Sequence, residues 1–98
     1  MATGRSPLIT GNQYGLAVGA SVVTLTVPAA ASAAEIYVRD AAIVFTRTGT
    51  DPTSTKGFQA DIGDIIMLNS RQEMTRFEAI RVSASATIDV EYFTALAG

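Results

Sequence analysis

The stretch RFEAIRVSASATIDVEYF, residues 76–93, decides the fold class, because apolar and acidic side chains alternate through its second half. Ile88, Val90 and Tyr92 occupy every second position, and the residues between them are acidic. This two-residue period is typical of a β-strand with one face in the core and one face in solvent. We therefore expect these three apolar side chains to face the core.

The first half of the same stretch is also rich in strand-forming residues, and a short ASA link separates the two halves. This arrangement predicts an antiparallel hairpin formed by residues 76–83 and 86–93, with one solvated face. Phe77 is out of phase with Ile80, which predicts a bulge near Ala79.

Working outward, further segments have the composition of strands. SVVTLTV, residues 21–27, alternates apolar side chains with threonine, and EIYVRDAAIVFTR, residues 35–47, is one bent strand or two short ones around Asp40. DIIML, residues 64–68, is an apolar run of strand length, and NSRQEMT after it is a turn or a short helix. Roughly five or six strands without a long helix predict an all-β fold, a small antiparallel β-sandwich or barrel.

The first 20 residues differ from the rest, because they contain four glycines and Pro7. We expect residues 1–20 to form an extended N-terminal arm and residues 21–98 to form a single β domain. A frayed terminus is the alternative. The segment is nevertheless more apolar than disordered tails usually are, so we expect it to order against a partner. The predicted partner-binding residues of the arm are Leu8, Ile9, Tyr14, Leu16 and Val18.

The composition narrows the classes of function. The chain has 98 residues, no cysteine and no histidine, so disulfides, thiolate metal sites and histidine catalysis are closed to it. Charged residues make up 16% of the chain, and a surface with so few ions is easily covered by other subunits. The net charge of −2 and the scattered basic residues argue against nucleic acid as a partner. We find no signal peptide or segment that predicts a membrane span.

Possible chemical sites have simpler explanations. Asp51, Asp61 and Asp64 could be imagined as metal ligands, but the neighbouring glycine and proline residues favour turns. Lys56 is the only lysine, so the hydroxyl groups have no obvious activating base. The alternating Asp89 and Glu91 fit a solvated strand face better than an acid–base pair. We therefore expect a protein that is not an enzyme and needs no cofactor or metal.

Apart from Tyr14 of the arm, most of the aromatic residues are expected in the core, with two exceptions. Phe93 follows the inward-pointing Tyr92 and should face the opposite way, so we predict that it contacts another subunit. Phe58 follows the polar segment RTGTDPTSTKG, residues 47–57, and is also a candidate partner-binding residue.

Short motifs in the second half of the chain resemble a group of small virion proteins of tailed phages. The matching pieces fall within roughly residues 36–93, and the first 20 residues match nothing in the pattern. They are Arg47, GTDPT (49–53), Gly57 with Phe58, GD (63–64), FEAIR (77–81) and VEYF (90–93).

The resemblance implies a structural protein of the virion, made in the host cytoplasm. It implies a capsid decoration, or cement, protein that binds the outside of the major capsid protein, with other copies of itself as partners and a trimer favoured. An N-terminal arm could then add a strand to a capsid-protein sheet. The alternative is a head-completion, neck or tail protein, and a host- or carbohydrate-binding module ranks below both.

Overall fold

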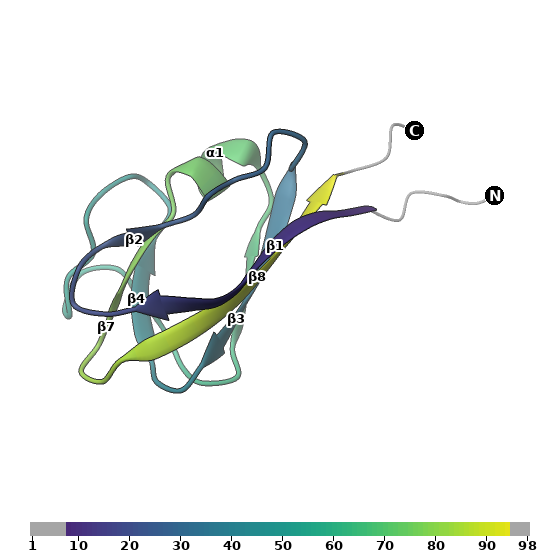
Figure 1. Ribbon diagram of the computed structural model, residues 1–98. Helices are drawn as coiled ribbons and strands as arrows, with labels where there is room; N and C mark the ends of the chain where they lie inside the picture. Colours follow the sequence, from purple (N-terminus) through teal and green to yellow (C-terminus); the bar gives the residue numbers. More distant parts are fainter. Residues whose placement is uncertain (1–7, 95–98) are drawn as a thin grey trace.

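The computed structural model describes residues 8–94, which form a two-layer antiparallel β-sandwich with one short helix (Figure 1). Sheet A contains, in spatial order, β1 (Leu8–Val18), β8 (Ala86–Thr94), β3 (Ala33–Arg39) and β6 (Ile65–Leu68). Sheet B contains β2 (Val23–Thr24), β7 (Glu78–Arg81), β4 (Ile43–Thr46) and β5 (Phe58–Ala60). The predicted all-β antiparallel sandwich is confirmed.

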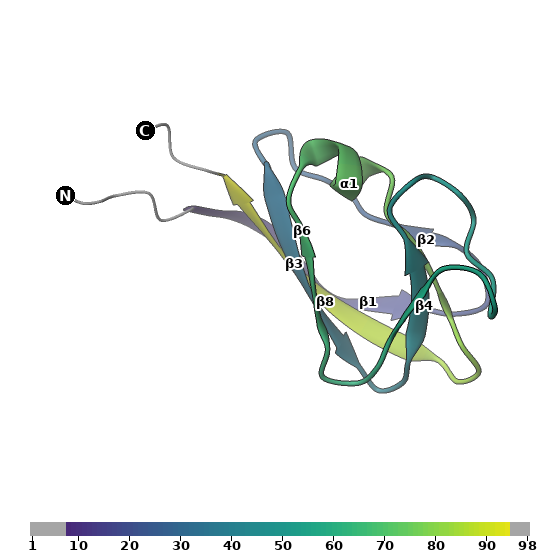
Figure 2. The ribbon, with the colours of Figure 1, turned by 180° about the vertical axis from the view of Figure 1, so that it is seen from behind.

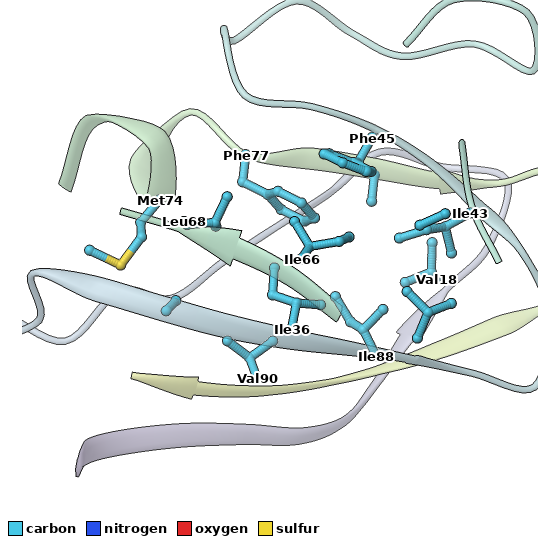
Figure 3. Close-up of a cluster of buried hydrophobic side chains, with 14 of the residues drawn as sticks. Val18, Ile36, Ile43, Phe45, Ile66, Leu68, Met74, Phe77, Ile88 and Val90 are labelled. Carbon is cyan, nitrogen blue, oxygen red and sulfur yellow. The ribbon is translucent and has the colours of Figure 1, made fainter. Parts of the chain in front are cut away.

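The core lies between the two sheets and is built by the alternation of side chains along each strand (Figure 3). On β8, the side chains of Ile88, Val90 and Tyr92 are fully buried, as the sequence predicts. Ile43 and Phe45 meet them from β4, and each buried side chain of this size stabilises the fold by roughly 1.5–3 kcal/mol.

The predicted hairpin of residues 76–83 and 86–93 is wrong. β7 pairs with β2 and β4 in sheet B, whereas β8 pairs with β1 and β3 in sheet A. Between them the chain crosses from one layer to the other, and the Val82 amide donates to the carbonyl of Ala42 on the way. The alternation of apolar and polar residues shows which face of a strand is buried, but it does not show which strand lies beside it. Two consecutive strands therefore have the same sequence pattern whether they pair in one sheet or face each other from opposite sheets.

The predicted bulge near Ala79 is also absent. Phe77 and Ala79 are both fully buried, and the β4–β7 register from Ile43 to Thr46 is regular. The inward phase is therefore set by Phe77 and Ala79, and Ile80 is only half-buried. The small side chain of Ala79 leaves room for the Phe45 ring, whose centroid lies 5.7 Å from that of Phe77.

The N-terminal segment is part of the sandwich from residue 8 onward, which differs from the expected boundary at residue 20. β1 pairs with β8 from Leu8 to Val18, with register shifts on either side of Gln13. The side-chain oxygen of Gln13 accepts hydrogen bonds from the Tyr92 hydroxyl and from the amide of Thr26. These bonds tie β1 to the body of the domain. Residues 1–7 of the expected arm lie outside the described residues.

The remaining elements follow the sequence with small differences. Only Val23–Thr24 of the expected strand at 21–27 forms a ladder, although Leu25 and Val27 still pack against the core. EIYVRDAAIVFTR forms two strands in opposite sheets, and Asp40 turns the chain between them with a positive φ of 72°.

The helix α1 (Arg71–Thr75) is one short turn and caps one end of the sandwich (Figures 1 and 2). Ser70 is its N-cap and accepts from the Glu73 amide, and the Glu73 carboxylate accepts from the Asn69 amide. This reciprocal pair explains why the helix begins after Ser70. Met74 is its buried residue.

Val90→Asp should lower the free energy of unfolding by about 4 kcal/mol, because it places an unpaired charge in the core. For a domain of this size the melting temperature should fall by about 15 °C or more. Thr87→Asp is the matched control, because Thr87 lies on the solvated side of the same strand opposite Arg39. Thermal unfolding of both variants checks the assignment, and a Val90→Asp protein that melts like the control would refute it.

Candidate interaction surfaces

The predicted partner-binding residues of β1 have different degrees of exposure. Leu8 and Ile9 are 57% and 65% exposed, and Tyr14 is also exposed. Leu16 is half-buried against the core, and Val18 is fully buried in it. Val18 therefore cannot contact a partner while the domain is folded, because its side chain already packs between the sheets.

The two predicted aromatic contacts lie at different places in the fold. Phe93 is half-buried on β8, opposite Ile9 on one side and Ala33 on the other. Phe58 begins β5 opposite Phe45, and its ring is 63% exposed. The Arg47 guanidinium carbon lies 5.9 Å from the centroid of the Phe58 ring, within cation–π range.

Exposed apolar side chains gather on one side of the sandwich, where β5 and β6 are the edge strands of the two sheets. We call this the edge surface and define it as Phe58, Ile62, Ile65 and Met67. Their exposed fractions lie between 43% and 63%. A groove of about 380 Å³ runs between β5 and β6 and is lined by three of these four residues. Isolated exposed apolar residues are ordinary, whereas Phe58, Ile65 and Met67 share one groove.

Sequence reasoning missed three of these four residues. Ile65 and Met67 belong to the apolar run DIIML, which was predicted only as a segment of strand length, and Ile62 precedes this run. The usable signal was the run itself, because a strand in a two-layer sandwich can bury only one of its faces in the core. Ile66 and Leu68 take the core face, so Ile65 and Met67 lie on the outer one.

A second surface lies on the outer face of sheet A. It is an acidic hollow of about 270 Å³. Its residues are Tyr14, Glu35, Tyr37, Asp89, Glu91 and, at the border with the edge surface, Ile65.

Hydrogen bonds organise most of the acidic hollow. The Tyr14 hydroxyl donates to Glu91 over 2.6 Å, and this bond is the main reason that the pKa of Tyr14 is raised. Asp89 accepts from the Gly15 amide at 2.7 Å and pairs with Arg39 at 3.1 Å.

Glu35 is the exception in the acidic hollow. It lies directly opposite Glu91, and its carboxylate has no partner among residues 8–94. Two like charges facing each other across a ladder are destabilising.

The segment 47–57 folds back over the outer face of β4. Val44 and Thr46 are buried beneath it, and Pro52 is buried within it. Gly57 adopts a φ of 127°, and a β-carbon there would lie 2.8 Å from the Val44 side chain. The close approach and the backbone conformation together require glycine at residue 57.

Asp51, Asp61 and Asp64 all serve local structure. Asp64 accepts from the Asp61 amide, which closes the turn between β5 and β6. Asp51, within segment 47–57, is a neighbour of Glu78 of β7, and its carboxyl group is the largest cause of the raised pKa of Glu78. Desolvation acts in the same direction, because the Oε1 atom of Glu78 is buried without a hydrogen-bond partner among residues 8–94.

Across residues 8–94, no group of three or more acidic residues is placed to hold a metal ion. The same residues include no helix with the length and apolarity needed to span a membrane. Comparison of the chain with protein-family models, with curated proteins and with solved structures finds no match.

Stability should depend on pH through Glu78. Because the pKa of Glu78 is raised in the folded protein, the stabilisation from its protonated form is complete below the ordinary value of 4.5. It is lost as the pH rises through the raised pKa of the folded state. Glu78→Gln keeps the group neutral, so its melting temperature should exceed that of the wild type at neutral pH.

The difference in melting temperature between Glu78→Gln and the wild type should shrink toward zero in acid. Melting curves recorded from neutral pH to below 4.5 test this expectation. In an Asp51→Asn background the same substitution should have a much smaller effect, because the opposing charge is gone. An equal advantage at all pH values would show that ionisation of Glu78 is not the cause.

Proposed function

We propose that this chain is a structural protein of a tailed-phage virion that decorates the outside of the capsid and stabilises the shell. Its partners are the major capsid protein and other copies of itself. The observation that carries the proposal is the exposure of Leu8 and Ile9 at the paired ends of β1 and β8. These ends reach beyond the body of the sandwich (Figures 1 and 2).

The position of Ile9 explains how such an end can bind. Ile9 lies opposite Phe93, so the two strands present a pair of apolar side chains away from the core. The main chain of β1 in this region is on the edge of sheet A and can accept a further strand. The low charge of the chain supports the same function, because few ions lose water when a shell covers the surface.

Binding to capsid shells tests the proposal. The full chain should sediment with expanded shells of the phage that encodes it, and Ile9→Asp should weaken this binding by at least about tenfold. Val22→Asp is the matched control, because Val22 is an exposed apolar residue on the connection between β1 and β2. Both variants should melt like the wild type.

Counting copies per virion by quantitative mass spectrometry separates the alternatives. A copy number comparable with that of the capsid subunits supports decoration. A single ring of copies would instead indicate a head-completion, neck or tail protein. Failure of the wild type to bind shells, together with its absence from virions, would overturn the proposal.

A further inference from the structure

The open edge of β6 offers main-chain groups that no other described residue uses. The Val38 amide donates to the carbonyl of Asp64, so Asp64 is a hydrogen-bonded position of the β3–β6 ladder. Hydrogen-bonded positions recur at every second residue of an antiparallel strand, so the next ones on β6 are Ile66 and Leu68. By the alternation of an antiparallel ladder, the N–H and C=O groups of Ile65 and Met67 point away from β3, toward the open edge.

This edge is short and sharply bounded. At one end, the amide of Gly63 donates to Val38 and that of Asp64 donates to Asp61. At the other end, the amide of Asn69 is taken by the Glu73 carboxylate. The edge therefore presents the main-chain N–H and C=O groups of two residues, Ile65 and Met67. A strand that pairs with this edge needs only two residues whose own N–H and C=O groups are free.

Beyond its N-terminal end at Leu8 and Ile9, the opposite edge of sheet A is less regular than the β6 edge. β1 has two register shifts along its length, and irregularities of this kind discourage pairing. Pro28 packs against the core-facing side of β1, where a β-carbon at Gly11 would lie 3.0 Å from the proline ring. The Thr26 amide also reaches across to Gln13. By contrast, the β3–β6 register contains no shift, and β6 carries exposed Ile65 and Met67.

We propose that the β6 edge pairs antiparallel with β6 of a second copy, about a two-fold axis at Ile66. In this register Ile65 of one copy lies opposite Met67 of the other. Because both residues have outward main-chain groups, each of the two equivalent pairs can exchange two hydrogen bonds. The two sheets A become one continuous sheet, and the edge surfaces of both copies come together.

The side chains at the ends of β6 favour this occupant and this direction. Asp61 and Asp64 precede the strand, whereas Asn69 and Arg71 follow it. Among residues 8–94 the Arg71 guanidinium bonds only carbonyl oxygens, including those of Pro28 and Ala31, and no carboxylate. Antiparallel pairing places the acidic end of each strand at the donor-bearing end of the other. Parallel pairing would set the aspartates of the two copies together, which is repulsive.

The pairing also covers the apolar groove next to β6. A two-fold axis perpendicular to the continuous sheet leaves both sheets B on the same side. Phe58, which lines the groove of each copy, then lies on the side where the two sandwiches meet. The two-fold pair goes beyond the proposed function and differs from the trimer that the motif resemblance implies.

The test is the molar mass of the purified full chain, measured by light scattering and analytical ultracentrifugation over about a hundredfold range of concentration. The chain has a mass of 10.2 kDa, and we expect a reversible shift to twice this value. A mass that stays at the monomer value, or a shift to three times it, would overturn the pairing. Binding to capsid shells is a separate measurement, so either proposal can fail without the other.

Two variants locate the interface. Met67→Pro removes an N–H that faces the open edge, so the ladder to β3 stays intact. Ile65→Lys places a charge on the edge, a device that blocks edge pairing. Each should raise the dissociation constant by at least about tenfold, and Val22→Lys should leave it unchanged. A dimer that persists unaltered in folded Ile65→Lys would show that the contact lies elsewhere.

Amide hydrogen exchange gives a readout without mutation. The amides of Ile65 and Met67 should exchange fast in dilute solution and slowly at concentrations where the mass doubles. The amides of Ile66 and Leu68 are the internal control, because they face β3 and should be protected at both concentrations. Equal exchange of Ile65 and Met67 at both concentrations in a protein of doubled mass would refute the β6 pairing.

Discussion

The sandwich depends on the position of its last strand. β8 lies between β1 and β3, so its main chain holds sheet A together on both sides, and its inward face supplies Ile88, Val90 and Tyr92 to the core. Burial raises the pKa of Tyr92 to about 12, and its hydroxyl is satisfied by Gln13 of β1. A polar group at this depth is tolerable because it has a partner.

The two edges of sheet A differ in regularity and in exposure. These differences decide which edge is open to pairing with another strand. The β1 edge is irregular and partly covered by the segment that leads to the turn at Pro28, except at its exposed N-terminal end. The β6 edge is straight, short and apolar. Natural sheets usually blunt such edges with charge, proline or bulges. In our two proposals, one sandwich meets two kinds of neighbour, one at Leu8 and Ile9 and the other at the edge surface.

The sequence was sufficient for the fold class because alternation reports burial directly. It identified the inward residues of β8 and the apolar run of β6, but it paired β7 with β8 although they lie in opposite sheets. Which strand is a neighbour depends on contacts between distant parts of the chain, and local alternation does not contain them. The edge surface was missed for a different reason: β6 buries only Ile66 and Leu68, so Ile65 and Met67 of the same apolar run lie on its outer face.

The pairing of β1 with β8 joins the two ends of the described chain. During synthesis β1 is the first of the described strands to be made, and its partner β8 is the last of them. Until then sheet A lacks its central strand, and the apolar faces of β3 and β6 have only part of their covering. Sheet A therefore closes only once β8 has been made, because its pairings join residues far apart in the chain. β6 is made before β8, so its apolar residues are without the complete sheet A until the last strand is added.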